Sequence, residues 1–328
     1  GLLQETCDAI HSRSKEIEQH IIKNWNDASD SKQYGRLVNM VAQYGAATNQ
    51  KNVTIPKPCM IIASADHGVA DMGVSAYPKE TTVGMTQNYL IPKGAGANSL
   101  ANYCGAHMEV IDMGIDADMS WVPGLRSHKL GMGTKNFVEE PAMTREQAIE
   151  GIETGIKLVQ EKMADGYNVF LVGEMGISNT TASALMTAKF AGLTAEEATG
   201  RGTNISDERL KLKQRIVHDV LVKYKDIPKD DAIGILAAVG GFEFTCIVGV
   251  ILGAAAHHGM VIIDGFNTSA CALVAKTLVP ASMDYVMASH LSAEKAAKSS
   301  LQNLGLEAYV DLGLCLGEAS GGSVQMGM

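Results

Sequence analysis

Aromatic side chains are scarce in this sequence. Phe, Tyr and Trp together make up 5% of its 328 residues, and only two of these residues are tryptophan. Proteins that stack nucleic-acid bases on their surface depend on such side chains, so we expect no nucleic-acid or sugar-stacking platform. The abundant small residues, among them 34 glycines, favour tight packing of helices and a sheet.

Positive charge is also in the minority. The chain has 27 Lys and Arg against 36 Asp and Glu, a net charge of -9, and no Lys/Arg-rich run. Nucleic acids and acidic membrane surfaces attract proteins through basic patches. We therefore expect neither nucleic acid nor membrane as a partner.

Long apolar runs are missing as well. One of the longest, CIVGVILGAAA at 246–256, falls short of the roughly 20 residues that span a bilayer. The N-terminal segment has no basic stretch followed by an apolar core, the pattern of a signal peptide. We expect no membrane span and a cytoplasmic protein.

The six cysteines are not arranged as metal ligands. They form no CxxC pair and have no histidines at zinc-finger spacing. We interpret them as reduced, mostly buried thiols. The sequence predicts no metal site and no cofactor.

What the chain does contain is a regular alternation of short apolar runs and helix-like segments. The runs end in small or polar residues and cover 58–64, 108–113, 167–172, 233–239, 260–263 and 284–289. Such runs are typical of buried parallel strands joined by crossover helices. The segments 144–166 and 207–225 have helical spacing, and Thr144, followed by Glu and Gln, predicts a helix cap. The pattern indicates an α/β fold, a mainly parallel sheet flanked by helices.

The two ends of the chain depart from this alternation and look helical or irregular. We therefore expect two domains. The large α/β domain covers residues 55–290, and a smaller, mostly helical domain is built from residues 1–54 together with 291–328.

Ligands of such sheets bind at the carboxyl ends of the strands. Carboxylates expected there or near the C-terminus are candidates for acid–base chemistry, although most of them are equally suited to bind loop amides. They are Asp66, Glu174, Glu243, Asp264 and Glu318. The histidines His67, His257, His258 and His290 are interpreted as core or surface residues, not as ligands.

The segment LVGEMGISNTTASALMTAKFAG, 171–192, carries the clearest phosphate signal. Gly173 and Gly176 permit a tight turn after a strand, and Ser178, Asn179 and Thr180 stand where a helix begins, with free backbone N–H groups. The alternative is that these side chains only cap the helix. The segment has neither the lysine of a Walker loop nor GxGxxG spacing.

A second glycine loop, GRGT at 200–203, adds Gly202 and a following helix that carries Lys213. This lysine either reaches a phosphate or is a solvated surface charge. Near the C-terminus, Glu318 stands among small residues in LGEASGGS, which suits an accessible general base.

Taken together, ADHGVADMGVSAYP, GEMGISNTT, GRGT, GGFE, DGF, SAE and LGE resemble, in order and spacing, the nicotinate-nucleotide:dimethylbenzimidazole phosphoribosyltransferase family over residues 60 to 325. The resemblance implies transfer of the phosphoribosyl group of nicotinate mononucleotide to an aromatic base that becomes the lower ligand of a cobamide. It also implies a homodimer.

The resemblance assigns roles to individual residues. Glu318 is the implied catalytic base, and Glu174 is a second catalytic residue. The residues implied to bind the nucleotide and its phosphate are Gly173, Gly176, Ser178, Asn179, Thr180, Gly202, Lys213, Asp264 and Ser292. The residues implied to bind the acceptor base are Ser75, Tyr77, Gly84, Met85 and Leu316.

Three residues depart from the family pattern. Ser178 and Asn204 stand where glycine is expected, and Gly84 stands where a glutamine is common. Losing that amide enlarges the acceptor pocket, so phenol, p-cresol, a purine or another benzimidazole are alternative acceptors. A phenolic acceptor would give an O-glycoside, and a heterodimer with a paralogous chain is the matching alternative assembly.

Two other classes of function compete with the transferase. One is a nucleotide-binding partner subunit without turnover, which the retained Glu318 and Glu174 disfavour. The other is a nucleotide hydrolase or kinase, against which the missing Walker lysine and nucleophile elbow count.

Overall fold

The computed structural model describes residues 1–28, 35–201, 205–290, 292–306 and 308–310. In this part of the chain the strands form one sheet in the order β3-β2-β1-β4-β5-β6-β7, and every neighbouring pair is parallel. The strands are β1 Pro58–Ala65, β2 His107–Gly114, β3 Arg126–Ser127, β4 Val169–Met175, β5 Met260–Ile263, β6 Val286–His290 and β7 Ala308–Val310. The predicted α/β class and parallel sheet are confirmed.

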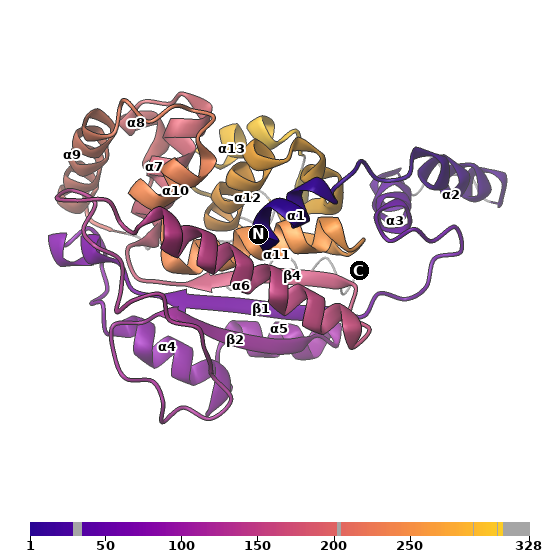
Figure 1. The fold of residues 1–328 in the computed structure, drawn as a ribbon, viewed down its shortest axis with the longest axis horizontal. Coiled ribbons are helices and arrows are strands. Elements are labelled where there is room, and N and C mark those ends of the chain that lie inside the picture. Colours follow the sequence, from indigo (N-terminus) through magenta and orange to yellow (C-terminus); the bar gives the residue numbers. More distant parts are fainter. Residues whose placement is uncertain (29–34, 202–204, 291, 307, 311–328) are drawn as a thin grey trace.

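Helices cover both faces of this sheet. They are α1 Leu2–Asp8, α2 Lys15–Ala28, α3 Gly35–Ala47, α4 Thr81–Leu90, α5 Gly96–Cys104, α6 Arg145–Ala164, α7 Asn179–Ala191, α8 Ala195–Ala198, α9 Asp207–Lys223, α10 Ala232–Val239, α11 Phe242–Ala256, α12 Phe266–Leu278 and α13 Ala297–Leu304, with short 3₁₀ helices η2 Gly68–Met72 and η3 Pro280–Tyr285. Helices α4 and α5 contact the sheet on one side, and α11 and α12 contact it on the other (Figure 1). The sheet is thus the middle layer of a three-layer arrangement.

The two long helices predicted from spacing form where they were expected. The hydroxyl of Thr144 accepts a hydrogen bond from the backbone N–H of Gln147 at 3.0 Å, and the Gln147 side chain accepts one from the N–H of Thr144 at 2.9 Å. This reciprocal capping box starts α6, as the sequence indicated. Helix α9 begins after Ser206, whose hydroxyl accepts from the N–H of Arg209.

One predicted strand is wrong. Residues 233–239 form the helix α10, which Asp231 caps by accepting from the N–H of Gly234 at 3.0 Å. The run IGILAAV is apolar at every position but its glycine, so its periodicity does not separate a buried strand from a buried helix. Contacts with α6, α7 and α12 on several sides explain why it is apolar all round.

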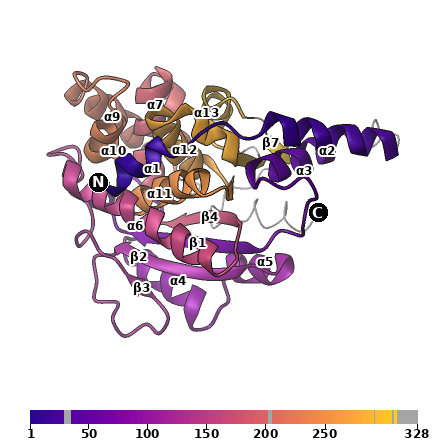
Figure 2. The same cartoon turned by 45° about the vertical axis from the view of Figure 1, so that its right-hand side comes forward.

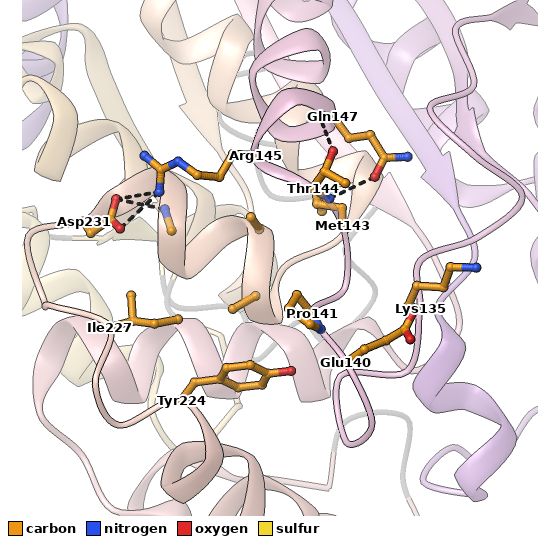
Figure 3. A pocket seen from close by; sticks show the side chains of 13 residues that line it. Lys135, Glu140, Pro141, Met143, Thr144, Arg145, Gln147, Tyr224, Ile227 and Asp231 are labelled. Carbon is orange, nitrogen blue, oxygen red and sulfur yellow. Dashed lines mark hydrogen bonds and ion pairs between the residues drawn. The ribbon is translucent and has the colours of Figure 1, made fainter.

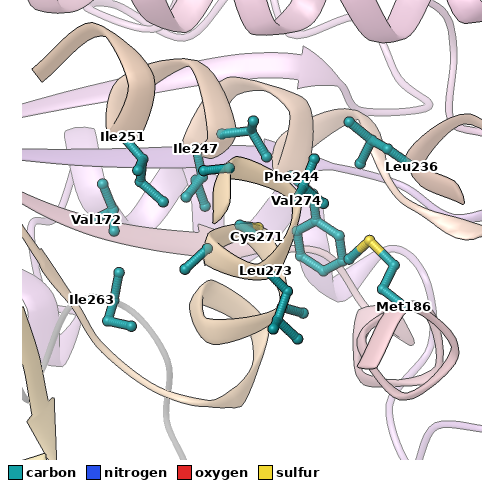
Figure 4. Packing of buried hydrophobic residues seen from close by; sticks show 14 of the residues in the cluster. Val172, Met186, Leu236, Phe244, Ile247, Ile251, Ile263, Cys271, Leu273 and Val274 are labelled. Atoms are coloured by element: carbon teal, nitrogen blue, oxygen red, sulfur yellow. The ribbon is translucent and has the colours of Figure 1, made fainter. Parts of the chain in front are cut away.

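Helix α11 is the centre of the apolar core. Fourteen of its fifteen residues are buried, which explains the apolar run at 246–256 without a membrane. Figure 4 shows side chains of β4, β5, α7, α10, α11 and α12 meeting here, among them Phe244, Ile247 and Leu273. No helix in the described ranges is long and apolar enough to cross a bilayer.

Helices α6 and α11 approach each other through glycines. A side chain at Gly155 would overlap the backbone of α11 near Cys246 and Val250, and one at Gly249 would overlap the backbone of Ile152. The small residues therefore set the distance between these helices.

The N-terminal segment is helical, as expected. Helices α2 and α3 pair with each other and project from one end of the molecule in both views (Figures 1 and 2). Helix α1 instead packs on α6 and α11, and β7 joins the edge of the sheet. The division into two domains stays a prediction.

Candidate active site

The strand order predicts a ligand-binding crevice at one point of the sheet. The chain order reverses between β1 and β4, the two central neighbours. In open parallel sheets, ligands bind outside the carboxyl ends of the strands at such a switch point. Asp66 and His67 follow β1, and Glu174 lies at the end of β4. The predicted site residue Glu174 therefore stands where the topology favours a ligand.

A fully buried ion pair lies next to this point. The Nε2 atom of His67 is 2.7 Å from Oε2 of Glu243, which belongs to the first turn of α11. Burial alone would lower the pKa of His67, but the charge and hydrogen bond of Glu243, with the charge of Asp66, raise it above its ordinary value. The close contact with Glu243 therefore favours the protonated form of His67.

Asp66 holds the backbone around the site. Its Oδ2 atom accepts from the N–H of Asp116 at 2.7 Å, and its carbonyl accepts from the N–H of Thr134 at 3.0 Å. The carboxyl group is buried, and burial raises its pKa despite that hydrogen bond. Asp66 thus joins the ends of β1 and β2 to the loop that follows.

Glu174 is buried among other acids. Its Oε1 atom accepts from the amide of Asn267 at 2.8 Å and from the amide of Asn179 at 3.3 Å. Its Oε2 atom is buried and has no hydrogen-bond partner among the described residues. Burial, together with the charges of Glu243 and Asp264, raises the pKa of Glu174 to about 8, although the two amide hydrogen bonds oppose the shift.

Gly176 is required by the close approach of the GEMG loop to this cluster. A side chain at Gly176 would overlap Oε2 of Glu243 and lie 2.6 Å from the carbonyl oxygen of Ala65. The loop therefore lies directly against the His67–Glu243 pair, and only glycine fits there. Gly173, inside β4, is buried in the sheet.

The start of α7 and a buried lysine lie in contact. Lys213, on α9, is 2% exposed and donates to the hydroxyl of Thr180 and to the carbonyl of Gly200, both at 3.0 Å. Burial lowers the pKa of Lys213, and the charge of Glu294 opposes this. The alternative of a solvated surface charge is wrong. A buried cation beside a helix N-terminus is suited to an anion.

Ser178 does not act as a helix cap. It precedes α7 with a positive φ of 76°, and its side chain makes no capping hydrogen bond. Its hydroxyl is buried and without a hydrogen-bond partner in the described part of the chain. Glycine adopts this conformation more readily than serine.

Asp264 lies at the end of β5, beside the same crevice. Its backbone N–H donates to the hydroxyl of Thr268 at 2.9 Å, and its Oδ1 atom is 3.6 Å from Nδ1 of His290. Ser292 lies further along, where its hydroxyl accepts from the N–H of Glu294 at 3.2 Å. Asp264 therefore belongs to the carboxylate cluster, since its charge acts on Glu174.

Of the residues predicted for the acceptor base, Ser75 and Tyr77 lie in the loop between η2 and α4, and Gly84 and Met85 lie on α4. The hydroxyl of Ser75 accepts from the N–H of Tyr77 at 3.2 Å, and Tyr77 is 53% exposed. Arg209 of α9 donates to the carbonyl oxygens of Gly73 and Ser75 and so ties this loop to the lysine-bearing helix. A side chain added at Gly84 would meet nothing within 4 Å, so the position is open.

Met85 is partly buried and packs in a small cluster with Met175, next to Glu174. The predicted residues Gly202, Leu316 and Glu318 lie outside the described residues.

Two members of the cluster, His67 and Asn267, were not predicted from the sequence, whereas Glu243 was among the candidate carboxylates. A signal for Asn267 was present, because GFNTS at the start of α12 repeats the Asn-Thr that starts α7 in GISNTT. The partnership of His67 with Glu243 spans 176 positions, so no local pattern could indicate it.

No group of three or more His, Cys, Asp or Glu in the described ranges is arranged to hold a metal ion. A separate cavity of about 590 Å³ lies between α6, α10 and the end of α9, where Arg145 pairs with Asp231 (Figure 3). None of the predicted site residues lines it.

Comparison with known proteins gives one consistent family. Residues 10–328 match the family model described as a phosphoribosyltransferase. The chain is 42% identical over 294 residues to the nicotinate-nucleotide–dimethylbenzimidazole phosphoribosyltransferase of Geobacter metallireducens, which covers 90% of this chain and 83% of the relative. The protein of the same name from Chloroflexus aggregans is 41% identical with the same coverage. The crystal structure of that enzyme from Thermus thermophilus superposes with a TM-score of 0.88 at 31% identity, over 95% of this chain and 93% of the other.

Proposed function

Because this chain belongs to the nicotinate-nucleotide–dimethylbenzimidazole phosphoribosyltransferase family, we propose that it moves the phosphoribosyl group of nicotinate mononucleotide to an aromatic base. The products are nicotinate and the α-riboside phosphate of a cobamide lower-ligand base. The acceptor is 5,6-dimethylbenzimidazole or a related aromatic compound.

The chemistry needs few groups. The bond from the ribose to the pyridinium nitrogen breaks, and nicotinate leaves with a neutral ring nitrogen, so no acid has to protonate it. The acceptor nitrogen forms the new bond from the opposite face and loses its N–H proton to a carboxylate, the role proposed for Glu318. Oriented binding of both partners supplies much of the acceleration.

The observation that carries the proposal for the donor is the anion site at the start of α7. The ammonium group of Lys213 donates to the hydroxyl of Thr180 at 3.0 Å, at the N-terminus of the helix that follows the GEMG loop. A ribosyl phosphate bound there extends its ribose toward the end of β4 and Glu174. Gly173, Gly176, Ser178, Asn179, Gly202, Asp264 and Ser292 complete the proposed nucleotide site.

The open position at Gly84 supports a wider choice of acceptor. Gly84 has no side chain, so no amide at this position of α4 can hydrogen-bond to a ring nitrogen of the acceptor. The open space beside Gly84 accommodates a different ring. The second candidate is therefore transfer to phenol or p-cresol. There Glu318 takes the O–H proton and the product is an O-glycoside. Ser75, Tyr77, Met85 and Leu316 are proposed to line the same pocket.

The assembly stays a prediction. We propose a homodimer, with a heterodimer of paralogous chains as the alternative that accompanies the phenolic acceptor. The cytoplasmic location and the two-domain division are likewise predictions.

The test is chromatographic detection of nicotinate released from nicotinate mononucleotide, with dimethylbenzimidazole, adenine, phenol and p-cresol offered separately. We expect release that depends on an acceptor and falls by about 100-fold or more in Glu318→Gln, because a general base contributes about 10²–10⁴-fold. Gly84→Gln is expected to shift the preference toward dimethylbenzimidazole by about tenfold, the value of one hydrogen bond.

The controls separate the competing functions. Gly84→Ala adds volume but no amide. We therefore expect this variant to prefer dimethylbenzimidazole less strongly than Gly84→Gln does. Absence of nicotinate release with every acceptor, from a folded protein, would contradict a self-sufficient enzyme and favour the non-catalytic partner subunit.

A further inference from the structure

Four chain segments bring titratable groups to one buried place. Asp66 and His67 follow β1, Glu174 ends β4, Glu243 begins α11 and Asp264 follows β5. Each of these side chains is at most 5% exposed. Several acids therefore lie in the same buried place as His67, and their mutual repulsion makes the protonation state of each acid a structural question.

The cation is committed to one acid. His67 and Glu243 are each fully buried and 2.7 Å apart, and the glycine loops at Gly176 and Gly241 pack against both side chains. A buried charge is stable only when it is paired and hydrogen-bonded. Glu243 is therefore the partner of His67 in this buried ion pair, and His67 does not pair with Glu174.

In the part of the chain that the structure describes, the other ionisable groups near Glu174 do not form an ion pair with it. Asp264 adds a second negative charge to its environment. His290 lies on the far side of Asp264, 3.6 Å from its Oδ1 atom. Cys271, on α12, stays a neutral thiol because burial raises its pKa. Lys213 is directed to Thr180 and Gly200.

Two asparagines fix which oxygen of Glu174 accepts. Asn267 takes a hydrogen bond from the Ser183 hydroxyl on its oxygen at 2.5 Å, so its amide nitrogen faces Glu174. That nitrogen also reaches the oxygen of Asn179 at 2.9 Å, and the amide nitrogen of Asn179 faces both Glu174 and Glu243. All donors reach Oε1, and Oε2 is left over.

We propose that Glu174 works as a neutral carboxylic acid, its proton on Oε2 donated to an acceptor oxygen of the bound nucleotide, and that His67 and Glu243 are positioning residues that maintain this state. An ionised Glu174 would place a third negative charge beside Glu243 and Asp264, next to the site of a phosphate dianion. A neutral acid avoids that repulsion and satisfies the unpartnered oxygen. The assignment of the ligand rests on the proposed function.

The first experiment is the pH profile of kcat/KM for nicotinate release, which follows the ionisation of the free enzyme. Burial and the neighbouring acids raise the pKa of Glu174 to about 8, so activity is expected to fall as the pH rises through this region. Glu174→Gln, which keeps a neutral donor of the same shape, loses that alkaline limb and lowers kcat/KM by at most about tenfold. Glu174→Ala removes the donor and lowers kcat/KM by about 100-fold.

Substitution of a positioning residue is expected to shift the pH profile of kcat/KM. In Glu243→Gln the repelling charge is gone, so the alkaline limb moves to lower pH by about one unit. Glu150→Gln, on the exposed side of α6, is the matched control and keeps the wild-type profile. A loss of activity in Glu174→Gln as large as in Glu174→Ala would overturn the neutral acid.

A measurement without turnover separates this inference from the proposed function. The infrared difference between wild type and Glu174→Gln at roughly pH 6, where an unperturbed glutamate is ionised, is expected to contain the C=O stretch of a protonated carboxyl group. The band should vanish as the pH passes about 8. No such band at roughly pH 6 overturns the inference. The band without any nicotinate release would contradict the transferase while leaving the neutral Glu174 in place.

Discussion

Ser178 shows how one residue combines two unfavourable features at the phosphate loop. Its backbone is in the left-handed region with a φ of 76°, and its buried hydroxyl has no hydrogen-bond partner among the described residues. A left-handed conformation costs a residue with a Cβ roughly 1–2 kcal/mol. Such strain is found mainly where a loop has a function that demands its shape.

The strain at Ser178 can be measured with two substitutions. Ser178→Gly relieves the backbone, and Ser178→Ala removes the hydroxyl but keeps the strain. We expect the glycine variant to be more stable than the alanine variant by about 1 kcal/mol, even though glycine adds freedom to the unfolded chain. Urea unfolding gives both free energies of unfolding. Equal stability of the two variants would show that the turn is unstrained.

At the scale of elements, the contact between α6 and α11 decides how closely the outer layer covers the core. Gly155 lies against the backbone near Cys246 and Val250, so even a methyl group there forces the helices apart. Well-packed interiors absorb such changes poorly. Glycine in mid-helix is unfavourable by itself, so its presence here reflects packing.

Gly155→Ala is therefore expected to lower the free energy of unfolding by about 1–3 kcal/mol, despite the better helix propensity of alanine. Gly84→Ala is the matched control, since Gly84 lies within α4 and has open space around it. There the same change should raise the free energy of unfolding by about 0.5–1 kcal/mol. Thermal or urea unfolding distinguishes them, and destabilisation of both would argue against a packing cause.

At the scale of the whole molecule, the buried acids couple the stability of the fold to pH. Glu174 lies in the central strand β4, so its carboxyl group is buried in the folded protein and exposed to water in the unfolded chain. Burial and the charges of Glu243 and Asp264 raise the pKa of Glu174 from 4.5 to about 8 in the folded state. The native state therefore binds this proton more tightly than the unfolded state does.

The sign of the pH effect follows from linkage. The stability contributed by Glu174 is fully present below pH 4.5 and is lost as the pH rises toward about 8, on the order of 5 kcal/mol in total. Glu174→Gln has no such dependence. We expect the free energy of unfolding of wild type, minus that of the variant, to fall steadily over this range in urea titrations. A difference independent of pH would contradict the raised pKa.

Local patterns in the sequence determined where several helices and strands of this protein form. The capping box at Thr144, the spacing of 207–225 and the apolar runs at 58–64 and 167–172 depend on neighbours within a few positions, so they predicted α6, α9, β1 and β4. The motif from Gly173 to Thr180 indicated the start of α7 for the same reason. The order of motifs also identified the family.

Only the tertiary structure decided which distant residues meet. The run at 233–239 is a helix because its neighbours surround it, and Lys213 is buried because α9 crosses the start of α7. The pairing of His67 with Glu243, and the resulting proton on Glu174, depend on the meeting of β1, β4 and α11. Burial and the distance between charges set a pKa, and both quantities exist only once the chain has folded.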